Sequence, residues 1–197
     1  MNIPASDVKK LRDRTGLGMM DCKKALVEAG GDMARSEEVL RKRGLKAAEL
    51  RAGRNAAQGR VGAYIHLNGK MGVLAEINCE TDFVAKTPEF RQLVKDLCMQ
   101  IAATNPKYVG PEEVPADVIA KEKEIMGEQF RDKPAQVLEK ILEGKIKDYY
   151  KQVCLLDQPF IKDTGMTVRA LVNGFIAKLG ENIVVKRFVR FAVGEEG

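Results

Sequence analysis

The N-terminal quarter of the chain alternates short amphipathic segments with glycines. Within each segment apolar residues recur three or four positions apart, which is the spacing of one face of an α-helix. A bundle of three such helices has little core, so much of its surface should be available for contacts. The pattern predicts these helices within residues 6–44, with apolar positions at Val8 and Leu11, then Cys22, Ala25, Leu26 and Ala29, then Val39 and Leu40.

Polar residues and glycines set the predicted helix ends. We expect Ser6 to cap the first helix, because a hydroxyl accepts hydrogen bonds from the free amides of a first turn. Thr15–Gly18 should end this helix and Gly30-Gly31 the second, since glycine readily adopts the left-handed conformation of a C-terminal cap. Asp32 is the predicted cap of the third helix, which we expect to stop at Gly44.

Residues 45–58 are rich in alanine, arginine and lysine and lack a clear apolar stripe. Such a segment is typical of an exposed helical linker between modules. We therefore predict a helical module in residues 1–50 with a linker to about residue 59, and a second domain in residues 60–197.

Residues 60–67 and 71–79 alternate apolar and polar side chains on either side of Asn68-Gly69. Alternation is typical of half-buried strands and Asn-Gly favours a two-residue type I′ turn, so we predict a β-hairpin. We expect its core-facing side to carry Val61, Ala63, Ile65 and Leu67 together with Val73, Ala75 and Ile77.

A helix that starts at Thr87-Pro88 should cover this hairpin, because threonine can cap a helix and proline suits its first turn. Its apolar stripe comprises Phe90, Leu93, Val94, Leu97 and Ile101. Further along, a helical hairpin should begin at Pro111–Pro115 and be split at Lys133-Pro134.

A helix around residues 171–179, a turn at Gly180–Asn182 and a strand from Ile183 to Val193 complete the predicted elements. The predicted fold class is α+β: a three-helix N-terminal module, followed by a small antiparallel β-sheet packed with helices, including the helical hairpin.

The charge balance does not favour direct nucleic-acid binding. Lysine and arginine number 33 against 28 aspartates and glutamates, a net charge of +5, and the basic residues are spread along the chain. Nucleic-acid-binding proteins usually gather such residues on one face. A small basic RNA-binding protein that uses residues 41–60 is the alternative, although no aromatic pair on a strand suggests base stacking.

The sequence contains little that enzyme chemistry requires. One histidine, His66, cannot build a multi-histidine metal site, and no glycine-rich phosphate loop occurs, so we expect no metal and no cofactor. Four separated cysteines suggest free thiols in a reducing cytoplasm, and neither a leader peptide nor a membrane-spanning run is evident. The carboxylates of Glu76, Glu80 and Asp82 leave an acid–base enzyme as a second alternative.

Two segments contain unusual residue choices. In residues 11–26, Met19 and Met20 begin a short helix beside Lys23. Methionine suits either an adaptable protein contact or the filling of a small core. In residues 76–86, Phe83 follows Asp82 after a strand; a ring folded under the sheet is the usual fate of phenylalanine, whereas a projecting ring would be an apolar anchor.

Both segments resemble the two sequence signatures of the elongation factor Ts family, in the family's order and spacing. The resemblance is to short bacterial members and covers nearly the whole chain. It continues through Asn105-Pro106, Lys133-Pro134, residues 139–144, Gln158–Phe160 and Glu181–Ile183.

This resemblance implies a translation factor and not an enzyme: a guanine-nucleotide exchange factor that binds elongation factor Tu, promotes release of GDP and Mg²⁺, and permits reloading with GTP. The first 50 residues would form a ubiquitin-associated-like (UBA-like) module that docks on the partner's nucleotide-binding domain. The family's phenylalanine wedges between helices of the partner near its magnesium and phosphate site. The positions that match the family's partner contacts are Leu11, Arg12, Met19, Met20, Lys23, His66, Thr81, Asp82, Phe83 and Val84.

The resemblance also implies a homodimer. Longer family members carry two related core subdomains, whereas this chain has one, and it is similar to members that pair two copies. We therefore predict a homodimer that binds two partner molecules. Arg131-Asp132 stands where a glycine-containing turn is expected, which leaves the geometry of the helical hairpin open.

Overall fold

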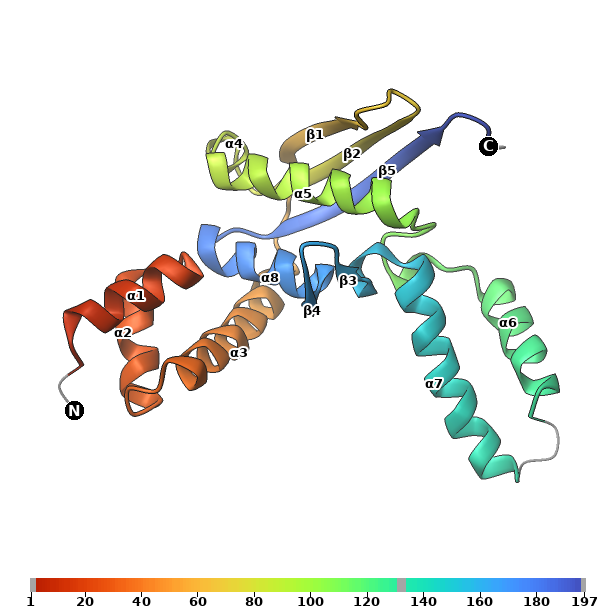
Figure 1. Ribbon diagram of the computed structural model, residues 1–197, viewed down its shortest axis with the longest axis horizontal. Coiled ribbons are helices and arrows are strands. Elements are labelled where there is room, and N and C mark those ends of the chain that lie inside the picture. Colours follow the sequence, from red (N-terminus) through yellow and green to blue (C-terminus); the bar gives the residue numbers. More distant parts are fainter. Residues whose placement is uncertain (1–2, 131–133, 196–197) are drawn as a thin grey trace. The chain divides into compact units, whose positions relative to one another are not determined.

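The computed structural model describes residues 3–130 and 134–195, and its fold is of the predicted α+β class (Figure 1). The described α-helices are α1 (Ala5–Thr15), α2 (Met19–Glu28), α3 (Met33–Arg51), α4 (Asp82–Ala85), α5 (Pro88–Thr104), α6 (Ala116–Glu128), α7 (Ala135–Val153) and α8 (Val168–Leu179). Two short 3-10 helices are η1 (Pro111–Glu113) and η2 (Leu155–Asp157). The strands are β1 (Gln58–Ile65), β2 (Met71–Cys79), β3 (Pro159–Phe160), β4 (Asp163–Thr167) and β5 (Ile183–Ala192).

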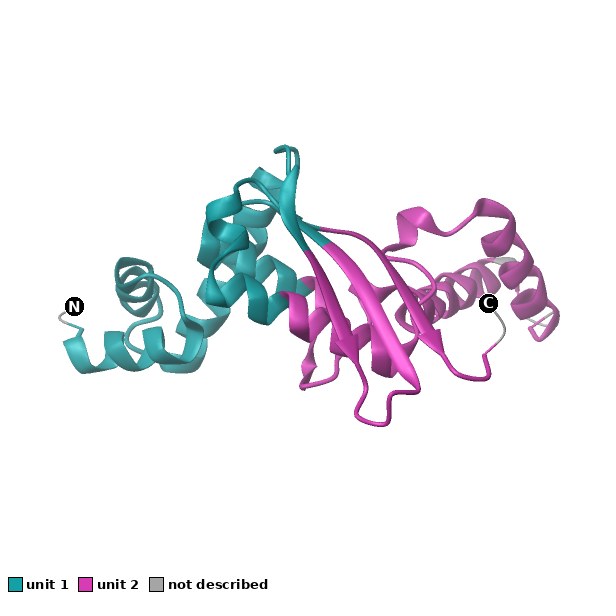
Figure 2. Cartoon of the chain, turned by 90° about the horizontal axis from the view of Figure 1, so that it is seen from above, with its two compact units in different colours: residues 1–60, 77–93, 170–184 teal, residues 61–76, 94–169, 185–197 magenta. Residues whose placement is uncertain are grey.

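The strands form two sheets, one of three strands in the order β1-β2-β5 and one of two strands, β3 and β4, which pair antiparallel. The chain divides into two compact units, coloured teal and magenta in Figure 2. The first unit comprises residues 1–60, 77–93 and 170–184, and the second comprises residues 61–76, 94–169 and 185–197. Each unit combines segments distant in the sequence, and the domain boundary near residues 50–60 stays a prediction.

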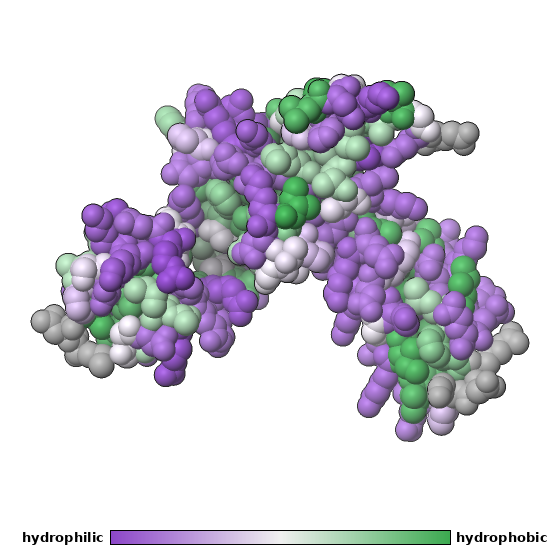
Figure 3. Space-filling model, in the orientation of Figure 1, coloured by the Kyte–Doolittle hydropathy of each residue, from purple (hydrophilic) through white to green (hydrophobic). Residues whose placement is uncertain are grey.

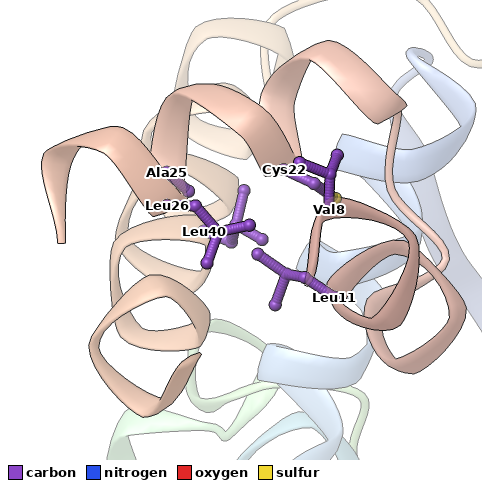
Figure 4. Packing of buried hydrophobic residues seen from close by; sticks show 6 residues of the cluster. All are labelled: Val8, Leu11, Cys22, Ala25, Leu26 and Leu40. Atoms are coloured by element: carbon purple, nitrogen blue, oxygen red, sulfur yellow. The ribbon is translucent and has the colours of Figure 1, made fainter. Parts of the chain in front are cut away.

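The three N-terminal helices enclose a small apolar cluster (Figure 4). Gly30 and Gly31 have positive φ angles after α2, and Asp32 Oδ1 accepts a hydrogen bond from Arg35 N at 2.9 Å, so both predicted boundaries are confirmed. The predicted Ser6 cap is wrong: α1 starts at Ala5, which places Ser6 inside the first turn. The buried residues of the cluster are Val8, Leu11, Cys22, Ala25, Leu26 and Leu40.

The predicted stop of the third helix at Gly44 is also wrong, since α3 continues to Arg51. Gly44 is buried, and a Cβ atom there would lie 3.6 Å from Ala177 Cβ in α8. Ala48, one turn later, is buried as well. Small residues therefore let α3 pass close to α8, and the glycine at position 44 serves packing instead of ending the helix.

The predicted type I′ turn at Asn68-Gly69 is wrong, although the hairpin itself is present. Such a turn needs positive φ at both residues, and only Gly69, at +67°, has it. The loop is longer: His66 N donates to Met71 O at 2.9 Å and Gly69 N donates to His66 O at 2.8 Å. A turn followed by a left-handed glycine thus replaces the two-residue connection.

The predicted core face of β1 is wrong as well. Val61, Ala63 and Ile65 are exposed, as is Leu67 in the loop, whereas Val73, Ala75 and Ile77 of β2 are buried as expected. The reason lies at Gly62, where an added Cβ would lie 2.2 Å from Val94 Cγ1 of α5. Helix α5 packs so close to β1 that the strand turns its glycine toward the helix and its branched residues away.

The cover helix is as predicted. Thr87 Oγ1 accepts a hydrogen bond from Phe90 N at 3.2 Å, and the stripe on α5 is buried throughout. The helical hairpin is formed by α6 and α7. Its predicted turn, Arg131-Asp132 with Lys133, lies outside the described residues. Helix α8, the turn at Gly180–Asn182 and β5 confirm the predicted C-terminal elements, while β3 and β4 were not anticipated.

In the second unit, the sheet exposes an apolar face. Glu76 in β2 and Arg187 in β5 form an ion pair at 2.8 Å, so both side chains lie on the same face of the sheet. Every second residue of each strand, counted from these two, points to that face as well. Green side chains gather over these strands at the top of Figure 3. The exposed apolar residues of this sheet face are Val61, Ala63 and Ile65 in β1, Leu74 in β2, and Val189 and Phe191 in β5.

Candidate functional site

The segment after β2 is a short helix and not an open loop. Thr81 has extended backbone angles and its Oγ1 accepts a hydrogen bond from Val84 N at 3.4 Å, so it is the N-cap of α4. Only Ala85 of this helix is buried. The thiol of Cys79 donates to Thr81 O at 3.1 Å, which fastens the start of the segment to the end of the strand.

Phe83 projects from α4 with 80% of its surface exposed, so the ring does not fold under the sheet. Burial of a phenylalanine is worth about 1.5–3 kcal/mol, and folding of this chain leaves that free energy unused. Asp82 lies beside the ring and pairs with Lys86, Nζ to Oδ2 at 2.5 Å. The hydrogen bond and charge of Lys86 lower the pKa of Asp82, so the segment presents an aromatic ring next to an ionised carboxylate.

Glu181 and Asn182, which the sequence analysis placed in a turn and in the family resemblance but not in the site, hold this segment in place. Glu181 Oε2 accepts hydrogen bonds from Glu80 N at 3.1 Å and Thr81 N at 3.0 Å, and its Oε1 accepts from Thr81 Oγ1 at 2.6 Å. In return, Asn182 N donates to Glu80 Oε1 at 2.7 Å. The partners are about a hundred positions apart in sequence. The signals in the sequence were the glycine before this Glu-Asn pair and the resemblance of Glu181–Ile183 to the family, and neither pointed to Glu80 or Thr81.

The N-terminal module presents a second apolar patch, on α2. Met19 and Met20 are exposed, the latter by 61%, and Lys23 is exposed one turn later. The two methionines are therefore not the core filling of the module. Arg12 is partly exposed and pairs with its neighbour Asp13 at 2.9 Å.

Leu11 is buried, unlike the other candidate contacts of the N-terminal module. It is 0% exposed and belongs to the apolar cluster between the three helices (Figure 4). A partner bound to the module surface cannot touch it, so any effect of Leu11 on binding has to pass through the packing of α1 against α2.

His66 belongs to the second unit and lies in the hairpin loop, beyond the end of β1. It is exposed, and its Nδ1 is 3.0 Å from Tyr64 Oη, which orients the imidazole ring. The ring is therefore accessible to a partner.

The carboxylates considered for acid–base chemistry each have a separate positive or donor partner. Glu76 pairs with Arg187, Glu80 lies 3.6 Å from Arg54, and Asp82 pairs with Lys86. Two carboxylates that act as acid and base on one substrate must both reach the reacting atoms of that substrate. Here each carboxylate is paired with a different cationic side chain. Among residues 3–130 and 134–195, no group of three or more His, Cys, Asp or Glu side chains is arranged to hold a metal ion.

Several side chains of the basic stretch at the end of the module have partners within their own unit. Lys42 pairs with Glu38 at 2.8 Å and Arg43 with Glu28 at 2.5 Å. Arg51 Nε donates to Gly180 O at 2.9 Å. These side chains support the fold of the module, and no observation favours them as a nucleic-acid surface.

The four cysteines are buried and free. Burial raises the pKa of Cys98 and of Cys154 to about 11, and burial together with the nearby Glu181 carboxylate raises the pKa of Cys79. These three thiols stay protonated near neutral pH, so they are not poised as nucleophiles. In the described part of the chain, no helix is both long and apolar enough to cross a membrane.

Known proteins are similar to this chain along nearly its whole length. The family model described as Elongation factor TS matches residues 38–195. Elongation factor Ts of Moorella thermoacetica is 60% identical over 195 residues, which cover 98% of this chain and 96% of the relative. Elongation factor Ts of Anaeromyxobacter sp. (strain Fw109-5) is 57% identical, with 98% and 89% covered, and that of Caldanaerobacter subterraneus subsp. tengcongensis is 56% identical, with 98% of both chains covered. The matched length and identity show that this chain belongs to the elongation factor Ts family of translation elongation factors.

Proposed function

We propose that this protein is a guanine-nucleotide exchange factor that binds elongation factor Tu and promotes release of GDP and Mg²⁺, so that GTP can load. The observation that carries the proposal is the exposure of Phe83, presented by α4 beside the ionised Asp82. A large apolar ring that is exposed to solvent beside a hydrogen-bond acceptor is typical of a residue that anchors a protein–protein interface. The family membership of the chain supports elongation factor Tu as the partner.

The proposed contact set has two parts. Thr81, Asp82, Phe83 and Val84 form the wedge, which enters the partner near its magnesium and phosphate site. Arg12, Met19, Met20 and Lys23 form the docking patch on the UBA-like module, in residues 1–50, and Leu11 supports this patch from below. His66 is a further proposed contact.

The mechanism needs no chemical step by this chain. A protein that binds the nucleotide-free partner more tightly than the GDP-bound one must lower the partner's affinity for GDP by the same factor, because the linkage is reciprocal. A differential affinity of about 5.5 kcal/mol would move a two-state balance from 1:99 to 99:1. The partner's affinity for GTP is lowered as well, so the direction of exchange follows from the concentrations of the two nucleotides.

The direct test is the release of labelled GDP from elongation factor Tu. The proposal expects the chain to accelerate release at substoichiometric concentration, with a saturable dependence on its concentration. A chain that bound the partner and left the release rate unchanged would contradict it.

We also propose that the chain forms a homodimer through the exposed apolar face of its three-stranded sheet. Ile65 is 65% exposed on this face, next to Leu74 and Phe191. Exposed apolar patches on a sheet that has one open face are typical of association surfaces. Glu76 and Arg187, at the end of this face, form an ion pair with each other within one chain.

A second copy of the chain is the occupant that fits this face. Two identical apolar sheet faces can pack about 10 Å apart with a two-fold axis between them, and each then covers the other. The dimer would carry two wedges and two docking patches and so bind two molecules of elongation factor Tu.

A further inference from the structure

The turn Gly180–Asn182 contacts the start of α4 through a concentrated set of hydrogen bonds. The Glu181 carboxylate takes three of them, two from the backbone amides of Glu80 and Thr81 and one from the Thr81 hydroxyl. Hydrogen bonds to an ionised carboxylate are stronger than those between neutral groups. All three donors lie within two positions of Asp82, and all these residues belong to one compact unit.

The same turn also holds the end of α3. The Asn182 side chain, which is almost fully buried, donates to Arg54 O at 2.8 Å and Ala52 O at 3.5 Å. Arg51 Nε donates to Gly180 O at 2.9 Å from the last turn of the helix. One turn of the chain thus fastens both the wedge segment and the helix that carries the docking module.

Helix α4 cannot keep its shape by itself. Four residues form a single turn, and an isolated turn of helix is unstable in water because fixing its dihedral angles gains only about one hydrogen bond. Its burial offers little more, since Ala85 is the one buried side chain and Phe83 points into solvent. The order of this segment therefore depends on the groups that fasten its first residues.

We propose that Glu181 is a positioning residue that holds Phe83 in the orientation in which it engages the partner. The inference deepens the proposed exchange function and rests on it. Preorganising a contact lowers the ordering cost of binding, so the free factor should already hold the wedge as the complex needs it. Glu181 does so without itself touching the partner.

The test compares Glu181→Ala and Glu181→Gln with Phe83→Ala in the full chain. GDP release is measured over a range of factor concentrations, which separates the plateau rate within the complex from the half-saturating concentration. Glu181→Ala should lower the plateau about tenfold, the size expected for loss of hydrogen bonds to a charged group, and should change half-saturation less because the docking patch is intact. Glu181→Gln keeps an acceptor oxygen and should fall between.

Glu89→Ala is the matched control. Glu89 lies 3.8 Å from Lys178 of α8 in the same unit, so this variant also removes one carboxylate, but one that pairs with α8 and not with the start of α4. Its plateau rate should equal that of wild type. Hydrogen exchange of the Glu80 and Thr81 amides provides a readout without the partner: protection should drop in Glu181→Ala and stay at the wild-type level in Glu89→Ala.

The double variant Phe83→Ala/Glu181→Ala decides whether Glu181 acts through the ring. If it does, the double variant should be no slower than Phe83→Ala alone, since the residues form one unit. Additive losses, a wild-type plateau in Glu181→Ala while Phe83→Ala is impaired, or unchanged amide protection would each overturn the inference and leave the exchange function standing. Wild-type rates in Phe83→Ala and Glu181→Ala alike would overturn both.

Discussion

The Lys86 ammonium lies 2.5 Å from the Asp82 carboxylate, one helical turn along α4 and its C-terminal cap. This hydrogen bond and the positive charge lower the pKa of Asp82 from the ordinary value of 3.8. A carboxyl with a lowered pKa loses its charge only as the pH falls through that lowered value. Asp82 is therefore ionised near neutral pH.

The first prediction follows from this pair. Lys86→Met should raise the pKa of Asp82 toward 3.8, because both the donor and the charge are removed. A carboxyl-carbon NMR titration of wild type and variant measures the two midpoints. A midpoint that does not move in the variant would show that Lys86 is not the cause of the lowered pKa.

The second prediction separates two residues of the N-terminal module. Leu11→Ala should destabilise the α1–α3 bundle by about 2–5 kcal/mol, since Leu11 is fully buried in its core. Met20→Ala should change its stability by less than about 0.5 kcal/mol and still weaken binding to elongation factor Tu, because Met20 is exposed.

Amide hydrogen exchange in α2 measures the stability of the bundle, and titration against elongation factor Tu measures binding. Protection that survived in Leu11→Ala would contradict the packing, and full affinity in Met20→Ala would exclude it from the docking patch.

The third prediction concerns the exposed sheet face. Wild type should sediment at twice the mass of one chain at micromolar concentration, and Ile65→Lys should sediment as a monomer, because a charge cannot be buried in the apolar interface at low cost. Leu50→Lys on α3 is the control, since Leu50 is similarly exposed but lies in the other unit. A wild-type protein that stayed monomeric would refute the proposed dimer.

The fourth prediction compares two glycines. Gly62→Ala should cost about 1–3 kcal/mol of stability, because its Cβ would lie 2.2 Å from Val94 Cγ1 and 3.1 Å from Cys98 Sγ. Gly174→Ala in α8, where nothing lies within 4 Å, should be neutral or stabilise by up to about 1 kcal/mol. Thermal unfolding followed by circular dichroism tests both, and a Gly62→Ala midpoint at or above that of Gly174→Ala would count against the close packing of α5 on β1.

Local features of the fold could be predicted where a side chain acts on its own neighbourhood. The Asp32 cap, the Thr87 cap and the stripe from Phe90 to Ile101 follow from hydrogen bonds and spacing within one helix. Gly44 and Gly62 were misjudged because their role depends on what packs against them, α8 in one case and α5 in the other. The sequence alone does not distinguish a glycine that lets two elements pack closely from a glycine that ends a helix.

The candidate site divides in the same way. Physical reasoning from the sequence favoured a buried Phe83, and only the family resemblance indicated the exposed ring that the structure has. Glu181 and Asn182 could not be assigned to the site, since their partners at Glu80 and Thr81 come together only in the folded chain. Leu11 matches a contact position of the family and is buried here, so its role in partner binding stays a prediction.

The central claim is tested most directly by the rate of labelled GDP release from elongation factor Tu with wild type, Phe83→Ala, Asp82→Ala and the exposed-leucine control Leu50→Ala. We predict that wild type and Leu50→Ala accelerate release equally and that Phe83→Ala is slower by about 30-fold, the effect of losing an interface anchor worth about 2 kcal/mol. Asp82→Ala should be slower as well. Release rates for Phe83→Ala and Asp82→Ala that both equalled that of wild type would contradict the account.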